Sequence, residues 1–485
     1  MTISSIQAYQ VLDSRGEPTV RVRIASDSGN VRQFDAPSGI SVSGMEAKSV
    51  YDGGSLYGGH GVSQNVMIIA NVIGPKFIGY PLGHQNDFDS LITALDGTLD
   101  KSRLGTNTLT ALSGAYFLLS CAEEKKTVWQ VVSDMLKTQP ALPRLFANLV
   151  AGGAHAPGLD LQEFMIVPKT TSPSQAAAII YDVRSTLQSI FQSLYGPAVR
   201  LSSEEGAMVP IGATSEVVLE ALEQLQSKFQ GLYEVSLDAA ANHFFTNGIY
   251  TLAQQELDMK QLADKYIAWD QKFPLLSIED PFAEQDLEGL KYLSAQTGKK
   301  FFIVGDDSTA TNSERIKTLA DQKLIGGVII KPNQAGTMTD MFAAISTAQS
   351  LGLKIIISHR SGETNDTMLA DLAYGIGAYG FKLGSPMRGE RVAKYNRLIE
   401  IEADQNLIPK GPSVAAQAGS QGQPTPPTPR PTIATPAPAP APIAQAVPAQ
   451  AIHNPPISKV APAAPQLHNA AANQLPNNIQ SQNSP

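Results

Sequence analysis

Cysteine is nearly absent from this chain. Its 485 residues contain one cysteine, Cys121, so no disulfide can form within the chain and nothing indicates an oxidising compartment. A free cysteine of this kind usually behaves as a small apolar side chain. We therefore expect Cys121 to be buried in the core.

Long hydrophobic runs are also missing. The most apolar early stretch, residues 66–78, is interrupted at Asn71 and Pro75, so it is too short and too broken to cross a bilayer. The first residues of the chain lack the basic segment followed by an apolar one that an export signal needs. These features predict a soluble cytoplasmic protein with no membrane span.

Charge is sparse and slightly acidic. Charged residues make up 16% of the chain and the formal net charge is −8 at pH 7, which argues against nucleic acid as the main partner. With 42% hydrophobic residues, most of the chain can bury a core. An acidic protein that binds an anionic substrate needs local positive charge, either from metal ions or from Lys and Arg gathered in a pocket.

The first part of the chain combines strand and helix patterns. Residues 3–35 alternate apolar and polar side chains between turn signals, as a short antiparallel meander does. Over residues 87–132 apolar side chains such as Leu112 and Leu119 recur at helical spacing. Together these patterns predict an N-terminal α+β domain over residues 1–135.

Six short apolar runs in the middle of the chain each end at a charged residue and are followed by a helical pattern. These terminal residues are Asp238, Glu279, Asp306, Lys331, His359 and Lys382. Strands buried on both faces have this composition, and their alternation with helices implies a parallel sheet. We predict a βα barrel over residues 136–410, whose C-terminal strand ends bring the charged residues into one pocket.

The last part of the chain, residues 411–485, is rich in Pro, Ala, Gln, Asn and Ser, and Arg430 and Lys459 are its only Lys, Arg, Asp or Glu residues. Such a segment cannot bury enough apolar surface to offset its ordering entropy, so we expect a disordered tail with polyproline-like stretches. It is either an inert tail, or a spacer or ligand for proline-recognising domains through residues 423–430. Its partner stays open.

The acidic strand ends indicate a metal site. Asp238, Glu279 and Asp306 would repel one another in a shared pocket unless positive charge lies between them, and their hard oxygen ligands favour Mg²⁺ over zinc. Each acid alone could equally be a cap or an ion-pair partner. Lys331 and Lys382 would face them; a nearby cation lowers a lysine pKa and makes it a base, but either lysine could simply neutralise the acids.

The loop after the fifth run offers groups that bind an anion. Arg360, the Ser361 hydroxyl and the backbone of Gly362 are suited to holding a phosphate or carboxylate. A base beside a carboxylate-bound metal suggests removal of a proton α to a carboxylate, with the metal stabilising the resulting charge. This combination of Lys and magnesium is the one established for the enolase superfamily.

Several segments resemble the signature motifs of the enolase family. They are residues 11–20, 277–282, 305–307, 330–334 and 358–364. The similarity runs in order from about residue 3 to residue 408. It implies an enolase-type βα barrel preceded by an α+β domain, Mg²⁺-dependent dehydration of 2-phosphoglycerate to phosphoenolpyruvate, two Mg²⁺ per active site, and a homodimer.

The resemblance also implies individual roles. Asp238, Glu279 and Asp306 would bind the tightly held Mg²⁺, and Ser41, on a loop that closes over the substrate, would contribute to the second. Lys331 would remove the C2 proton.

On the other side of the substrate, Glu205 would be the acid that helps the C3 hydroxyl leave, supported by Glu163. The residues implied to bind substrate are Ser41, His155, Gln162, Glu163, Glu279, Asp306, His359, Arg360, Ser361 and Lys382.

Departures from the family pattern gather on the lid and leaving-group side. The loop at residues 38–44 is one residue longer, the interval from His155 to Glu163 is one residue shorter, and two glycines around the acid are replaced, which makes Glu204 a rival for its role. A divergent paralogue with little turnover that acts as a binding protein is therefore an alternative. A relative acting on another carboxylate is less favoured because the phosphate-binding residues are present.

Overall fold

The computed structural model describes residues 1–39, 43–297 and 300–405. Ser41, the expected domain end at residue 410 and the expected tail over 411–485 lie outside the described residues. Within the described part, no helix has both the length and the apolar character needed to cross a membrane. Cys121 is buried, as predicted.

The first three strands form the antiparallel meander that the alternating pattern predicts. β1 (Ile3–Leu12), β2 (Pro18–Ser26) and β3 (Val31–Asp35) pair in that order. The inward side chains of β2, Val20, Val22 and Ile24, are fully buried, because the sheet packs one face against helix α4.

Helices follow this sheet, as the helical periodicity predicts. They are α1 (Ser63–Ile68), α2 (Gly74–Phe77), α3 (Gln85–Asp96), α4 (Thr106–Glu123) and α5 (Val128–Leu136), with the short 3-10 helix η1 (Leu56–Gly59) and the π-helical turn η2 (Ile69–Ile73). α4 also contacts the barrel: the Thr106 hydroxyl donates to the Asn333 carbonyl at 2.6 Å and the Thr110 hydroxyl to that of Gly336 at 3.0 Å. These bonds join the first part of the chain to the barrel.

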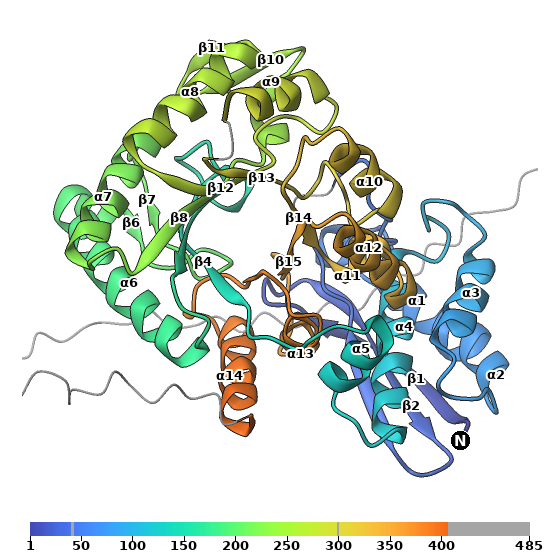
Figure 1. Ribbon diagram of the computed structural model, residues 1–485. Helices are drawn as coiled ribbons and strands as arrows, with labels where there is room; N and C mark the ends of the chain where they lie inside the picture. The colour runs from blue at the N-terminus through green and yellow to red at the C-terminus, as the bar shows by residue number, and fades with distance from the viewer. Residues whose placement is uncertain (40–42, 298–299, 406–485) are drawn as a thin grey trace, which may run out of the picture. The chain divides into compact units, whose positions relative to one another are not determined.

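Eight of the described strands close into a barrel in the order β12-β13-β14-β15-β16-β4-β5-β8, drawn at the centre of Figure 1. They are β4 (Arg144–Ala151), β5 (Glu163–Pro168), β8 (Tyr233–Asp238), β12 (Leu275–Glu279), β13 (Phe302–Gly305), β14 (Gly327–Ile330), β15 (Lys354–Ser358) and β16 (Gly380–Lys382). The six predicted strands are β8 and β12 to β16, so the predicted barrel is confirmed.

The strand β5 departs from the all-parallel sheet that the sequence pattern implies. It pairs antiparallel with both β4 and β8. The chain between β4 and β5 holds only the short 3-10 helix η3 (Gly153–His155), and a parallel crossover needs about a dozen residues or more, usually with a helix. The reversal places Glu163, the first residue of β5, level with the last residue of β8, Asp238.

Helices surround the barrel, and short strands lie in the connections between its main elements (Figure 1). The helices are α6 (Pro173–Tyr195), α7 (Ser215–Lys228), α8 (Met259–Lys272), α9 (Leu287–Thr297), α10 (Ser313–Asp321), α11 (Pro332–Ala335), α12 (Met338–Ser350), α13 (Met368–Gly375) and α14 (Gly389–Asp404). The smaller elements are η4 (Gly196–Ala198), η5 (Ala241–Phe244), β6 (Val199–Arg200), β7 (Val209–Pro210), β9 (Phe245–Thr246), β10 (Ile249–Leu252) and β11 (Gln255–Leu257).

The barrel interior explains where the polar site forms. An apolar cluster comprises Phe146, Met165, Val167, Val304, Ile329 and Ile356. Because side chains alternate across a strand, the residue two positions after each of these faces the same side. Val304 is thus followed by Asp306, and Ile329 by Lys331. The strands place apolar side chains lower in the barrel and charged side chains at its C-terminal mouth.

Candidate active site

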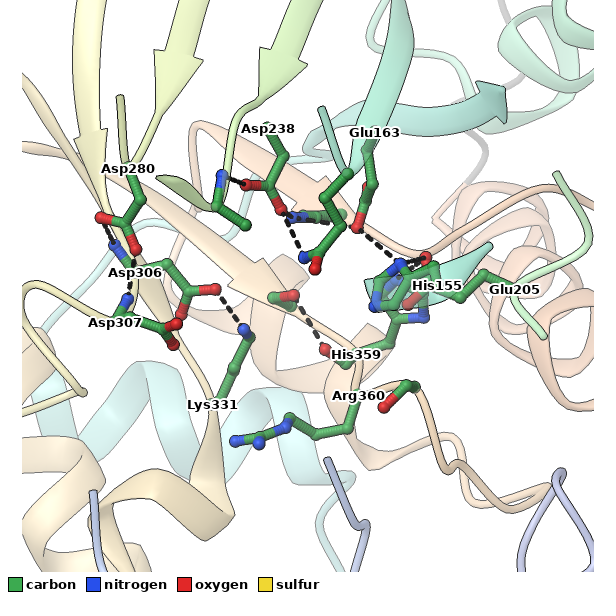
Figure 2. Close-up of a pocket in the computed structure, with 15 residues that line it drawn as sticks. His155, Glu163, Glu205, Asp238, Asp280, Asp306, Asp307, Lys331, His359 and Arg360 are labelled. Carbon is green, nitrogen blue, oxygen red and sulfur yellow. Dashed lines mark hydrogen bonds and ion pairs between the residues drawn. The ribbon is translucent and has the colours of Figure 1, made fainter. Parts of the chain in front are cut away.

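A polar pocket lies at the C-terminal mouth of the barrel (Figure 2). Its lining residues are His155, Gln162, Glu163, Glu205, Asp238, Ala240, Asp280, Asp306, Asp307, Lys331, Ser358, His359, Arg360, Ser361 and Lys382. The predicted site residues within the described part are all in this set except Glu279, which contacts Lys382 from behind the lining. Ser41 lies outside the described residues.

Lys382 gathers three carboxylates around its ammonium group. Nζ donates to Asp238 Oδ2 and Glu279 Oε1, both at 2.7 Å, and lies 3.3 Å from Glu163 Oε1. Burial lowers the pKa of Lys382, but the attraction of these carboxylates outweighs it and the pKa is raised well above its ordinary value. Lys382 is therefore a permanent cation that balances buried negative charge.

Lys331 is held by Asp306. Its ammonium donates to Asp306 Oδ2, while Gln334 Nε2 donates to the other oxygen at 3.1 Å. Burial and the like charges of Arg360 and Lys382 lower the pKa of Lys331, yet the contact with Asp306 outweighs them and the pKa is raised. The predicted lowering of the Lys331 pKa depends on a divalent cation beside the amine as well as on neighbouring positive side chains, so it stays a prediction.

The donor set fits a hard divalent cation. Asp238, Glu279 and Asp306 come from the adjacent strands β8, β12 and β13, in which Glu279 pairs with Asp238 on one side and with Val304 on the other. The three carboxylates are 1%, 3% and 6% exposed, so their charge is buried and requires a cation nearby. An all-oxygen set of this kind suits Mg²⁺.

Two further aspartates, Asp280 and Asp307, line the pocket and were missed in the sequence. Oxygens of Asp280, Asp306 and Asp307 lie within 4.8 Å of one another. Asp280 also accepts hydrogen bonds from the backbone N–H groups of Asp306 at 3.0 Å and Asp307 at 2.6 Å. Burial and the charge of Asp306 raise the pKa of Asp307 to about 7. The doublets Glu279-Asp280 and Asp306-Asp307 were the available signal.

Glu205 lies between two buried imidazoles on the opposite wall (Figure 2). Its Oε2 is 3.7 Å from His155 Nδ1, 3.6 Å from His359 Nε2, and accepts from Asn148 Nδ2 at 3.3 Å. Burial raises the pKa of Glu205, but cationic neighbours outweigh it and the pKa is lowered. Burial lowers the pKa of both histidines. Burial also raises the pKa of Glu163 well above its ordinary value, which favours its protonated form.

Glu204, the rival of Glu205 in the sequence, does not line the pocket. It is half-buried, and the charges acting on it include those of Arg15, Glu17 and Asp13 from the start of the chain. Burial raises the pKa of Glu204. The structure therefore brings Glu205 to the other site residues and keeps Glu204 on the outer side of the same loop.

Buried side chains hold the loop that carries Arg360 and Ser361. Arg391 is fully buried and donates from Nη1 to the Arg360 carbonyl and from Nη2 to the Ser361 carbonyl, both at 2.8 Å. The Arg360 backbone N–H donates to Glu363 Oε1 at 2.9 Å, and Lys394 lies 2.8 Å from Glu363 Oε2. These contacts fix the backbone of the loop that carries the two residues predicted to bind an anion. No local sequence signal points to Arg391 as a supporting residue.

The fold and site together define a βα-barrel protein with a buried, lysine-balanced carboxylate site at the C-terminal strand ends. Comparison with known proteins narrows this class. Residues 3–132 match the N-terminal domain of enolase, and residues 139–412 match the C-terminal TIM barrel domain of enolase. The chain belongs to the enolase family.

This chain covers nearly the whole length of three curated relatives. The enolase of Aeropyrum pernix is 37% identical over 406 residues, which cover 82% of this chain and 94% of the relative. The enolase of Methanocaldococcus jannaschii is 36% identical over 409 residues, covering 84% and 96%. The enolase of Elusimicrobium minutum is 35% identical over 407 residues, covering 83% and 96%.

Proposed function

We propose that this chain is a hydro-lyase that removes water from 2-phosphoglycerate to give phosphoenolpyruvate. The observation that carries the proposal is the meeting of Lys331, Asp238, Asp306 and Glu205 in one pocket of an enolase-family barrel, with Glu279 in contact with Lys382 of the same pocket. The reaction breaks the C2–H bond and then the C3–O bond. A base is needed on one side of the substrate and a proton donor on the other.

On the base side, Lys331 Nζ accepts the C2 proton. The amine must be neutral to do so, and the charges of Lys382 and Arg360 favour that form while Asp306 opposes it. Asp238, Glu279 and Asp306 would hold a magnesium ion, which would supply positive charge to stabilise the charge that develops on the substrate carboxylate.

On the leaving-group side, Glu205 gives a proton to the C3 hydroxyl, which departs as water. Glu205 is ionised in the free protein, so it must take up a proton when substrate binds. Glu163 supports this role as a neighbour of His155: its Oε1 lies 3.8 Å from His155 Nδ1, and the same nitrogen lies 3.7 Å from Glu205 Oε2.

The remaining residues hold the substrate. Arg360 and Ser361 bind the phosphate by charge-assisted hydrogen bonds, and Lys382 binds near the substrate carboxylate. His359, His155 and Gln162 line the rest of the pocket. Ser41 would close over the substrate and contribute to a second Mg²⁺.

We also propose the wider organisation that the sequence predicts. It comprises an α+β domain over residues 1–135, a barrel domain over 136–410 and a tail over 411–485, in a cytoplasmic homodimer with two Mg²⁺ per active site. The family matches at residues 3–132 and 139–412 support a division near residue 135.

Isotope exchange tests the proposal. The protein is incubated with 2-phosphoglycerate and Mg²⁺ in heavy water, and NMR follows both loss of the C2 proton signal and formation of phosphoenolpyruvate. We expect both, and Lys331→Ala should abolish both, whereas Lys317→Ala, an exposed lysine on α10, should leave both unchanged. Neither exchange nor product in the wild-type protein would overturn the proposal and favour a binding protein without turnover.

A further inference from the structure

A groove lies at the N-terminal ends of the barrel strands, at the end of the barrel opposite the active site. It has a volume of about 450 Å³ and is lined by Leu276, Ser294, Thr297, Lys300, Phe301, Phe302, Ile303, Lys323, Leu324, Ile325, Gly326, Lys354 and Tyr379. Phe302 and Lys354 are the first residues of β13 and β15. A second groove of about 540 Å³ shares Leu276 and Lys300 with the first, so the two are neighbours; together they are here called the basal groove.

The basal groove is positively charged in an acidic protein. Lys169, Lys300, Lys323 and Lys354 line it, and among the described residues of its lining the one acid is Glu234. Glu234 is already neutralised by Arg144, whose Nη2 lies 2.6 Å from Glu234 Oε2. Within the described part of the chain, none of these four lysines forms an ion pair. The groove therefore holds four uncompensated charges, against a formal net charge of −8 for the whole chain.

The floor of the basal groove is apolar and its charges stand at the rim. Leu276, Phe302 and Tyr379 line the groove and are half-buried, while Lys300 and Lys323 are exposed. Lys354 is held in place by two rings, with Nζ 5.0 Å from the centroid of Phe302 and 5.4 Å from that of Tyr379. An occupant must bring both apolar side chains and negative charge.

These features favour an extended peptide over other anions. A small-molecule site needs buried polar groups that converge on the ligand, whereas the charges here are dispersed along the rim. A single-stranded nucleic acid needs open aromatic faces for stacking, whereas Lys354 lies over both Phe302 and Tyr379. We propose that the basal groove docks an extended acidic segment of a partner protein, in which Asp or Glu alternates with apolar residues.

Binding of a model peptide tests this inference on the full-length protein. The probe is a fluorescein-labelled peptide of alternating Glu and Leu, and anisotropy measures its dissociation constant. The groove variant is Lys300→Glu with Lys323→Glu. The matched control is Lys125→Glu with Lys137→Glu, two exposed lysines outside the basal groove. Each variant replaces two lysines by glutamates, so the two change charge equally, and each includes a residue with positive φ, Lys323 at 59° and Lys125 at 54°.

We expect the groove variant to weaken peptide binding by about tenfold or more, since two attractive charges become repulsive, and the control by less than about twofold. Added salt should weaken binding to the wild-type protein. Phosphoenolpyruvate formation should be unchanged in the groove variant, because the basal groove and the active site occupy opposite ends of the barrel; binding and turnover thus fail independently. Absence of peptide binding, equal weakening in both variants, or tighter binding of an oligouridylate or of tripolyphosphate than of the peptide would overturn the inference.

Discussion

The carboxylate of Glu46 accepts two hydrogen bonds from the guanidinium of Arg360 at the mouth of the barrel. Oε2 accepts from Nη1 at 2.9 Å and Oε1 from Nη2 at 3.3 Å, and the two residues are 6% and 4% exposed. Glu46 belongs to the N-terminal part of the chain and Arg360 to the loop after β15. The proposed phosphate-binding arginine is therefore oriented by a residue that lies 314 positions away in the sequence.

Removal of the Glu46 carboxylate should weaken both stability and substrate binding. Glu46→Ala leaves the buried Arg360 charge without this partner, which should lower the free energy of unfolding by about 3 kcal/mol and raise KM for 2-phosphoglycerate by about tenfold or more, because the guanidinium is no longer fixed. Urea unfolding and steady-state kinetics measure the two effects. Glu314→Ala, an exposed acid on α10, is the control. Unchanged values for Glu46→Ala would remove its positioning role.

Loss of the Lys382 ammonium should make stability depend more strongly on magnesium. Lys382→Met leaves Asp238, Glu279 and Glu163 facing one another without the cation that now lies among them. We expect a loss of about 3 kcal/mol or more in metal-free buffer and a larger rise in Tm on adding Mg²⁺ than in the wild-type protein, because a bound cation would restore the balance. Thermal unfolding across a Mg²⁺ titration measures this. A smaller magnesium shift in the variant would argue against these carboxylates as the metal site.

The barrel and its charged strand ends could be predicted because both depend on local patterns. A run such as Gly327–Ile330 followed by Lys331 specifies a buried strand and the residue at its end without knowledge of the rest of the chain. The antiparallel direction of β5 was not predicted. The direction of a strand depends on the connection before it, and the connection between β4 and β5 lacks an α-helix. The supporting roles of Glu46 and Arg391 were not predicted, because they arise only from contacts between distant segments.

Side-chain contacts also decide the pKa of Lys331 among the protein groups. The sequence places other cations nearby, which lowers a lysine pKa, but it does not say which carboxylate touches the amine. Direct contact with Asp306 decides the sign, and the pKa is raised. Charge type can be predicted from strand ends, whereas the pairing of charges depends on side-chain geometry.

Asp89 should make stability fall as the pH rises. It is 2% exposed, and its Oδ2 accepts from the Thr339 backbone N–H at 2.9 Å and hydroxyl at 2.7 Å, linking α3 to α12. Burial raises the pKa of Asp89 above its ordinary value, so the folded state holds the proton more tightly than the unfolded state. Its contribution to the free energy of unfolding therefore decreases from below the ordinary Asp pKa up to the raised one.

Asp89→Asn should remove that slope. Urea unfolding at a series of pH values between about 4 and 7 measures it, with Asp321→Asn, an exposed residue at the end of α10, as the control that should retain the wild-type slope. Equal slopes in the wild-type protein and Asp89→Asn would mean that Asp89 is not a source of the pH dependence.

Variants of Glu205 and Glu204 should separate removal of the C2 proton from loss of the C3 hydroxyl. Glu205 lines the pocket at 3.7 Å from His155, whereas Glu204 is absent from the lining and faces the charges of Arg15 and Glu17. Glu205→Gln should reduce phosphoenolpyruvate formation by about 10²–10⁴-fold, the usual contribution of a general acid, yet still exchange the C2 proton, because Lys331 stands on the opposite side of the substrate. Glu204→Gln should retain both activities. The heavy-water NMR experiment measures proton exchange and product formation in one sample. If Glu204→Gln instead lost product formation while Glu205→Gln kept it, the proton donor would be Glu204, and the loop would have to change conformation when substrate binds.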